Sequence, residues 1–205
     1  MKATAWLGGL AAVLLAAGAG AYVFRGEIAT RLVERTAQNA MRASLVEQLP
    51  DGLHAAFCGT GSPLPDRTRA GPCLAIIAGP HTFVFDAGEG ASETLALMGV
   101  QQDKIEAVYL THLHSDHIDG LDTVALQHWA TGSAQAPLNV VGPAGTARVV
   151  AGLNEAYAID QTYRVTHHGP DVMPPTGAGM RAEEVAIPLT DGEESELRNA
   201  DDVRI

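Results

Sequence analysis

The sequence predicts an α/β domain with a central sheet, preceded by an apolar N-terminal segment. In the later part of the chain, short apolar runs alternate with helical stretches, as in strands joined by helices. Hydrophobic residues make up 46% of the 205 residues, which is enough for a core. No charged residue lies between Lys2 and Arg25. We therefore expect three parts: a membrane signal over 1–25, a linker helix over 26–50 and a folded domain over 51–205.

The elements of the domain are expected in order along the chain. Gly79 and Pro80 form a turn between two apolar runs, which predicts a hairpin. Strands are expected from Leu53 onward and over 73–77, 82–85, 104–110 and 138–143, and helices over 91–100, 119–132 and 146–159. Residues 183–189 and 201–205 could form further strands. The strand over 104–110 is mainly apolar, which is typical of a strand buried on both faces.

The N-terminal segment has the features of a membrane signal. Ala5 to Phe24 are 20 residues, which as a helix span about 30 Å, the thickness of one hydrocarbon core. The segment is either an uncleaved anchor or a cleaved secretory signal with small residues at 19–21. A buried core helix fits less well at the extreme N-terminus behind a lone lysine. We expect the domain on the periplasmic side of a bacterial-type membrane, anchored through this helix, or secreted after cleavage.

Residues 26–49 have apolar side chains at mostly four-residue steps, which predicts a helix. The residues Pro50, Asp51 and Gly52 then end it. We interpret this helix as a spacer next to the membrane.

The chain has two cysteines, too few for a disulfide scaffold. Cys58 ends one expected strand and Cys73 begins its expected neighbour, so their Cα atoms could lie within bridging reach. An oxidising compartment would allow the pair to form a disulfide. Zinc binding by the pair is less favoured, because no third sulfur or nearby imidazole accompanies it in the sequence.

The net charge of −11, without a lysine- or arginine-rich run, argues against nucleic acid as a partner. Affinity for nucleic acid depends largely on cationic side chains that neutralise phosphates. Residues 181–205 hold eight of the 24 carboxylates, and we interpret them as a solvated face.

The stretch THLHSDHIDG at 111–120 concentrates metal-ligand residue types at the end of a buried strand. Functional residues of α/β sheets collect at such strand ends. His112 and His114 are two residues apart, so in an extended segment their side chains point the same way. Asp116 and His117 follow where the chain turns, and can aim at a second point nearby. Imidazole and carboxylate without thiolate suit divalent ions such as zinc.

The alternative is that these histidines are exposed, or that each is satisfied singly in the core. That interpretation would suit one isolated histidine. Placing this many polar groups directly after an apolar strand is costly unless something binds them. The pattern therefore predicts a metal site.

The pattern H-x-H-x-D-H resembles the signature of the metallo-β-lactamase superfamily. The resemblance covers roughly 53–163. It is nearest to the ribonuclease Z and arylsulfatase-like branch, through GTGSPLPDRTRAGPC at 59–73 and FDAGEG at 85–90. The fold that it implies is an αββα sandwich, of which this chain would be the N-terminal half, incomplete and C-terminally truncated.

The resemblance implies two divalent metal ions in the complete protein, with zinc as the expected metal. His112 and His114 would bind the first ion, and Asp116 and His117 the second. Asp116 would also orient or deprotonate the attacking water. Asp86 would orient a ligating imidazole, although a strand-end turn would explain this residue equally well.

The resemblance also requires a third histidine for the first metal, a bridging aspartate and a final histidine for the second. His128 lies within an amphipathic helix, where a packing role is expected. His167 and His168 occur in THHGP, which is interpreted as lining the cleft mouth or as a plain loop in preference to metal ligation, and their role stays open. The chain alone is expected to bind metal weakly.

The function expected for the full-length form is a metal-dependent hydrolase that acts on an ester-type bond such as a phosphodiester, sulfate ester or lactone. The alternative is a non-catalytic metal-binding pseudo-enzyme of the same fold. A purely structural membrane-tethered module would leave the cluster at 112–117 unexplained.

Overall fold

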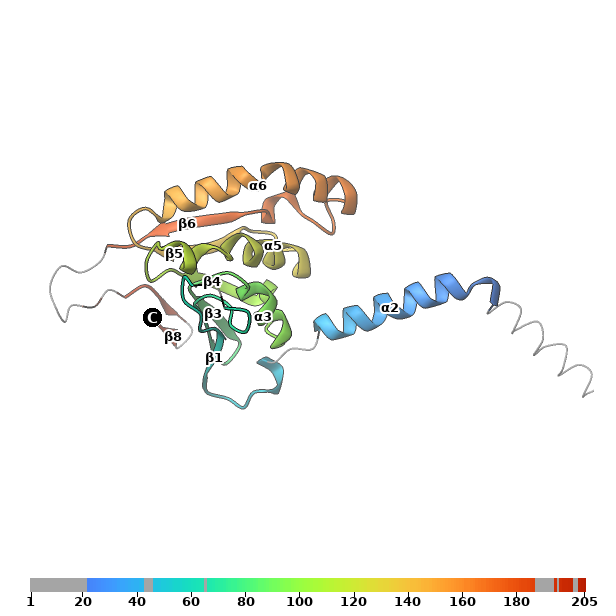
Figure 1. The fold of residues 1–205 in the computed structure, drawn as a ribbon, viewed down its shortest axis with the longest axis horizontal. Helices are drawn as coiled ribbons and strands as arrows, with labels where there is room; N and C mark the ends of the chain where they lie inside the picture. The colour runs from blue at the N-terminus through green and yellow to red at the C-terminus, as the bar shows by residue number, and fades with distance from the viewer. Residues whose placement is uncertain (1–21, 43–45, 65, 187–193, 195, 201–202) are drawn as a thin grey trace, which may run out of the picture. The chain divides into compact units, whose positions relative to one another are not determined.

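The computed structural model describes residues 22–42, 46–64, 66–186, 194, 196–200 and 203–205 (Figure 1). Its helices are α2 (Arg25–Arg42), α3 (Ala91–Leu97), α4 (Ser115–Ile118), α5 (Leu121–Gly132) and α6 (Thr146–His168). Single 3-10 turns are η1 (Val46–Gln48), η2 (Gln102–Lys104) and η3 (Pro175–Gly177). The strands are β1 (Leu53–Gly59), β2 (Cys73–Ala78), β3 (His81–Phe85), β4 (Ile105–Tyr109), β5 (Leu138–Gly142), β6 (Met180–Glu184), β7 (Asn199–Ala200) and β8 (Val203–Arg204).

The chain divides into two compact units, Met1–Ala43 and Ser44–Ile205. The strands β1 to β8 lie in the second unit. Helix α2 lies in the first.

Six strands of the second unit form one mixed sheet in the order β1-β2-β3-β4-β5-β6. The pairs β1/β2 and β2/β3 are antiparallel, and β3/β4, β4/β5 and β5/β6 are parallel. The hairpin predicted around Gly79 is confirmed, with Ala78 opposite His81. The parallel strands require crossover connections, which α3, α5 and α6 supply.

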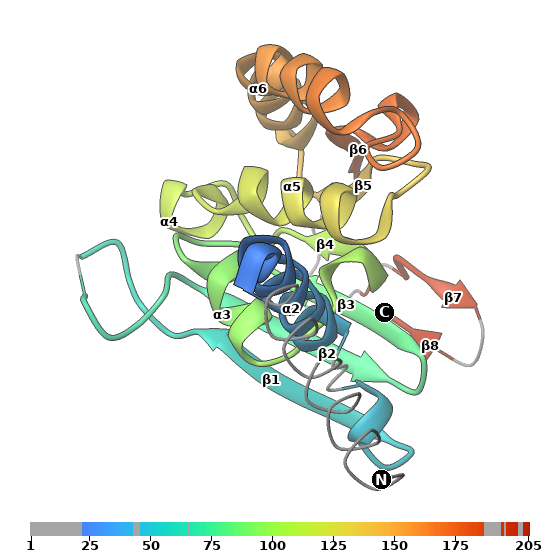
Figure 2. The same ribbon diagram turned by 90° about the vertical axis from the view of Figure 1, so that its right-hand side faces the viewer.

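The sheet separates two apolar clusters because successive side chains of a strand point to opposite faces. One cluster joins the sheet to α3, α5 and α6, through residues that include Ala75, Val84, Val108, Val140, Leu95, Val124 and Val150. The other combines Phe83, Ala107, Tyr109 and Val141 with the partly buried Leu197, Val203 and Ile205. Figure 2 shows β7 and β8 on the right of β3 and α3 on its left. The helices therefore cover one face of the sheet, and the C-terminal hairpin covers part of the other.

Helix α6 is longer than the sequence predicts. It continues past residue 159 to His168 and ends at Gly169, whose φ of 85° is in the left-handed region. Local interactions hold the added turns: Arg164 pairs with Asp160 at 2.6 Å, and the Thr166 hydroxyl donates to the backbone carbonyl of Thr162. The expectation of a loop at THHGP is therefore wrong for its two histidines, because they lie in the last helical turn.

Strand β6 also begins earlier than expected, at Met180 instead of residue 183. Its parallel pairing with β5 places Met180 opposite Leu138 and Glu184 opposite Gly142. The register of the neighbouring strand, rather than local apolar content, fixes these bounds.

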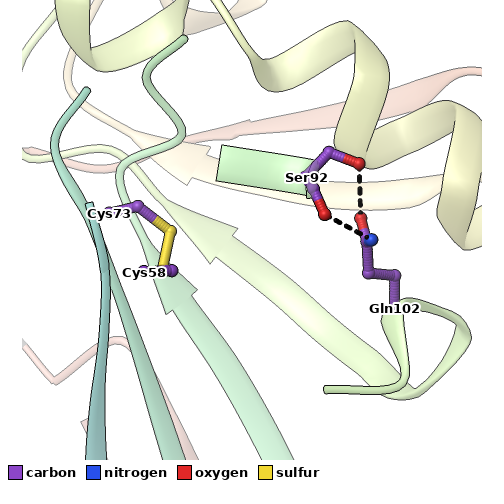
Figure 3. Close-up of a disulfide and its surroundings, with 4 residues drawn as sticks. All are labelled: Cys58, Cys73, Ser92 and Gln102. Carbon is purple, nitrogen blue, oxygen red and sulfur yellow. Dashed lines mark hydrogen bonds between the residues drawn. A yellow bond between two sulfur atoms is a disulfide. The ribbon is translucent and has the colours of Figure 1, made fainter. Parts of the chain in front are cut away.

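The disulfide proposed between Cys58 and Cys73 is present, with a Cα–Cα distance of 4.9 Å (Figure 3). Both cysteines are buried, and they join β1 to β2 at the base of the loop over 60–72. Figure 3 also shows a buried polar pair: the Ser92 hydroxyl donates to the Gln102 side-chain oxygen, and the Gln102 amide donates to the Ser92 carbonyl. This pair ties α3 to η2.

Loss of the disulfide should destabilise the second unit. The bridge closes a loop with a sequence separation of 15 residues, and restricting such a loop in the unfolded chain stabilises by about 3 kcal/mol. We expect the double variant Cys58→Ala/Cys73→Ala to lose about that free energy of unfolding in denaturant titration. Treatment of the unmodified protein with a dithiol should produce a similar loss. Two reactive thiols in the untreated protein would contradict the bridge.

The membrane segment expected over Ala5 to Phe24 lies outside the described residues, except for 22–24. Within the part of the chain that the structure describes, no helix is long and apolar enough to cross a membrane. The linker helix expected over 26–49 corresponds to α2, which ends at Arg42.

Candidate functional site

The candidate site lies at the carboxyl ends of two neighbouring parallel strands, β3 and β4. Asp86 follows β3 directly, and the segment 111–117 follows β4. His112 and His114 precede α4 in non-helical backbone, and Asp116 and His117 lie within α4. The predicted division into an extended pair and a turn pair is therefore what the backbone shows.

The first histidine pair brings two ring nitrogens close together. His112 Nε2 and His114 Nδ1 are 3.0 Å apart. Zinc binds imidazole nitrogen at about 2.0–2.1 Å, so both atoms could contact one ion. The two-residue spacing thus brings both rings to the same side of the segment.

In the second pair, Asp116 and His117, the His117 ring contacts two carboxylates. His117 Nδ1 lies 2.8 Å from Asp86 Oδ2, and His117 Nε2 lies 3.7 Å from Asp116 Oδ2. The ring centroid of His117 is 4.0 Å from that of His112, so the two pairs are adjacent. If Nδ1 donates to the carboxylate, Nε2 keeps a free lone pair on the side of Asp116.

Asp86 is buried and makes hydrogen bonds to several residues of the site. Its Oδ1 accepts a hydrogen bond from the Thr111 backbone N–H at 2.9 Å, and its Oδ2 accepts one from the Thr111 hydroxyl at 2.8 Å. The same hydroxyl lies 3.0 Å from His112 Nδ1. One carboxylate thus contacts His117 directly and His112 through Thr111. The backbone φ of Asp86 is 58°, in the left-handed region, which aspartate tolerates better than most residues.

Thr111 is the site residue that the sequence reasoning did not identify. A threonine directly before the first histidine, at the end of a strand, is the only local signal. Its role depends on Asp86, which is 25 residues away in sequence, so only the paired strands reveal it.

Glycines that pack against the segment 112–117 allow three backbone segments to approach closely. A Cβ at Gly88 would lie 2.3 Å from the Asp116 carbonyl oxygen, and one at Gly120 would lie 2.2 Å from the Gly88 oxygen. Gly71 approaches the same place from the disulfide-closed loop, and its N–H donates to the Glu89 carbonyl at 2.8 Å. The cluster therefore rests on backbone packing that has no room for side chains.

Tyr109 ends β4 and links the site to the second apolar cluster. Its carbonyl accepts a hydrogen bond from the Asp86 N–H at 2.9 Å, and its ring packs against Phe85. Burial raises the pKa of the Tyr109 hydroxyl above its ordinary value. The phenol therefore stays protonated at neutral pH.

The donor types and their spacing fit divalent metal ions, but the donor count is incomplete. Zinc sites in proteins have three or four protein ligands. Among the residues that the structure describes, no group of three or more histidine, cysteine, aspartate or glutamate side chains is arranged to hold a metal ion. The pair His112 and His114 and the pair Asp116 and His117 therefore supply two donors each, fewer than a zinc ion requires.

The remaining histidines of the later chain do not complete either pair. His128 lies on α5, and its Nδ1 is 3.2 Å from the Gln102 carbonyl oxygen, which agrees with the expected packing role. The N-terminus of α6 lies near Leu113, since a Cβ at Gly145 would be 2.9 Å from that side chain. His167 and His168 are at the other end of this 23-residue helix, about 30 Å away at 1.5 Å per residue.

Comparison with known proteins finds sequences that are similar to part of this chain. A family model described as "Anti-Pycsar protein Apyc1" matches residues 53–142. The chain is 42% identical over 142 residues to ribonuclease Z of Mycolicibacterium gilvum, a match that covers 68% of this chain and 47% of that protein. It is 45% identical over 125 residues to ribonuclease Z of Mycobacterium marinum, covering 60% and 45%. The chain spans about half the length of the curated relatives it matches.

Two solved structures are also similar to the chain. Human tRNase Z, short form, superposes with a TM-score of 0.45 at 24% identity, over 52% of this chain and 39% of that one. The metallo-β-lactamase-fold protein YhfI from Bacillus subtilis gives a TM-score of 0.45 at 19% identity, over 70% and 50%.

The chain is a metallo-β-lactamase-fold protein, built here on a six-stranded mixed sheet. Within that class, it is related to ribonuclease Z.

Proposed function

We propose that the cluster at 112–117 is one half of a binuclear metal site and that the protein is a metal-dependent hydrolase. The observation that carries the proposal is the pair of nitrogens 3.0 Å apart on His112 and His114, beside a His117 ring held by the Asp86 carboxylate. The family relationship supports the same reaction class. The donors that complete each ion's shell would come from outside the segment 112–117.

Metal ions bound there would lower the pKa of water and polarise the bond under attack. The chain's own residues would prepare the site for them. Asp86 would hold His117, and Thr111 would hold His112, each with Nε2 free. Asp116, beside His117, would accept or deliver a proton at its carboxylate.

The substrate class that we propose is a phosphodiester. The relatives that support it are named ribonuclease Z, and they act on RNA by that name. These relatives make RNA a candidate substrate, although the net charge of −11 provides little attraction for a long polyanion. A short or small phosphodiester satisfies both observations.

Metal binding is the first test. We expect zinc or manganese, titrated calorimetrically into the metal-free full chain, to bind weakly and to raise its melting temperature. Replacing His112 and His114 together by alanine should remove the binding. The matched control is His167→Ala/His168→Ala, which removes two histidines at the far end of α6 and should leave binding unchanged. Equal loss in both variants would contradict the assignment.

A second candidate function is metal binding without catalysis. It is favoured by the absence, within the described part of the chain, of a group of three or more metal-ligating side chains. Hydrolysis of bis(p-nitrophenyl) phosphate separates the candidates. Metal-dependent turnover that the His112 and His114 changes abolish would support the hydrolase, and binding without turnover would support the pseudo-enzyme.

We also propose that residues 1–25 direct the domain to the periplasmic side of a membrane. The disulfide between Cys58 and Cys73 supports an oxidising compartment. Alkylation of thiols in intact cells, before and after reduction, checks it: a mainly reduced pair in the native protein would contradict export.

A further inference from the structure

The disulfide-closed loop, residues 60–72, packs against the backbone of the candidate site. The Gly71 N–H donates to the Glu89 carbonyl at 2.8 Å. In the other direction, the Gly88 N–H donates to the Pro72 carbonyl at 3.0 Å. Gly88 and Glu89 belong to the turn that follows β3. The end of the loop is therefore bound, backbone to backbone, to this turn.

The same contacts reach the segment 112–117. A Cβ at Gly71 would lie 3.1 Å from the Asp116 carbonyl oxygen, so the loop also touches α4. The Ala87 N–H donates to the His117 carbonyl at 2.9 Å, which joins the turn after β3 to the same helix. The loop, the turn and α4 are therefore in mutual contact, and a displacement of the loop removes support from α4.

Between its ends, the loop has few interactions that would fix its position. Residues 62–64 and 66–69 are exposed, so their side chains bury little surface. The Gly61 N–H donates to the Ala70 carbonyl at 2.7 Å across the base of the loop. The position of the loop therefore depends on its base, where the disulfide lies.

The disulfide holds an irregular end of strand β1. The β1/β2 register passes from the pair Phe57 and Leu74 to the pair Gly59 and Cys73. Cys58 is therefore the extra residue of a β-bulge, with no residue of β2 directly opposite it. Its buried disulfide joins this strand end to the start of β2 (Figure 3). The bridge thus fixes the point at which the loop begins.

We propose that the disulfide between Cys58 and Cys73 is a redox switch for the candidate site. The closed bridge keeps the loop against the turn after β3 and α4, and reduction loosens all three segments and lowers the metal affinity of the segment 112–117. The effect on metal affinity rests on the proposed function. A dithiol reduces the bridge to two thiols and is itself oxidised to a disulfide, so two electrons and two protons are exchanged. A chain in a reducing compartment would therefore bind metal more weakly than an exported one.

Hydrogen exchange of the metal-free full chain tests the switch independently of metal. Mass spectrometry compares the oxidised protein, the protein reduced by a dithiol and the variant Cys58→Ala/Cys73→Ala, which serves if the buried bridge resists reduction. We expect exchange to be about ten-fold faster in peptides that cover 86–91 and 111–120. A peptide that covers β5, residues 138–142, should exchange at the same rate in all three samples.

Titration with manganese measures the effect on metal binding. Manganese replaces zinc in this experiment because the thiols and the dithiol would bind zinc themselves. We expect the affinity for manganese to fall about ten-fold in the reduced protein and in the double alanine variant. The matched control is Leu138→Ala, which removes a fully buried side chain at the end of β5 that lies away from the site. This variant is less stable but should keep the affinity of the oxidised parent at a temperature where it is folded.

Unchanged exchange over 86–91 and 111–120, in a protein whose two thiols are fully alkylated after reduction, would overturn the proposal. Equal acceleration in the β5 peptide would also overturn it, because the bridge would then stabilise the whole unit and not the site. An equal loss of affinity in Leu138→Ala has the same meaning. Faster exchange at the site in a protein that binds no manganese in either redox state would confirm the structural coupling and reject the proposed metal site.

Discussion

Replacing Asp86 by alanine should destabilise the second unit by about 2–5 kcal/mol and weaken metal binding 10- to 100-fold. The change takes the acceptor from three partly buried donors, the Thr111 N–H, the Thr111 hydroxyl and His117 Nδ1–H, and each buried donor that stays unpaired costs about 1–3 kcal/mol. The effect on metal affinity follows from releasing the rings that would bind the ion. Thermal unfolding and calorimetric titration of zinc measure the two effects.

The variant Asp86→Asn separates stability from ring orientation. Asparagine tolerates the left-handed φ of 58°, and its oxygen can still accept from the Thr111 N–H. Its NH₂ group would face His117 Nδ1 as a donor, which forces the ring proton onto Nε2. We expect near-native stability with weakened metal binding, and a changed His117 tautomer in ¹⁵N NMR spectra. Unchanged metal binding in this variant would show that Asp86 only stabilises the fold.

Replacing Gly88 by alanine should cost about 3 kcal/mol or more and lower the melting temperature by about 6–12 °C. The new Cβ would lie 2.3 Å from the Asp116 carbonyl oxygen and 2.7 Å from the Gly71 carbonyl carbon. Both atoms belong to backbone, so neither can move aside without separating the segments that support the cluster. Differential scanning calorimetry measures the shift.

The matched control is Gly152→Ala in α6. A Cβ at Gly152 would meet nothing within 4 Å. Alanine is about 1 kcal/mol more favourable than glycine inside a helix, so this variant should be slightly more stable than the parent. If Gly88→Ala unfolded at the same temperature as Gly152→Ala, the close packing around Gly88 would be wrong.

The parts of the fold and site that are predictable from the sequence are those encoded locally. Apolar runs bounded by glycine and proline indicate β2, β3, β4 and β5, and the cluster at 112–117 is contiguous in sequence. The disulfide is predictable because Cys58 lies at the end of one expected strand and Cys73 at the start of the next.

The parts that escape prediction depend on residues distant in sequence. Thr111 matters because Asp86 lies beneath it, and Gly71, Gly88 and Gly120 matter because three backbones converge there. The last turns of α6 have no apolar periodicity, so local hydrogen bonds and the Arg164 pair hold them as a helix. Each case is a tertiary or polar interaction that apolar periodicity does not record.

The order of strands in the sheet has a consequence for biosynthesis. Since β1 to β6 stand side by side in the order in which they are made, each new strand finds its partner already formed. Within these six strands, none must wait exposed for a neighbour encoded much later, which is the situation that favours aggregation in parallel sheets. Asp86, the histidine cluster and the glycines that pack against them all precede β5 in the chain, so the candidate site can assemble while β5 and β6 are still being synthesised.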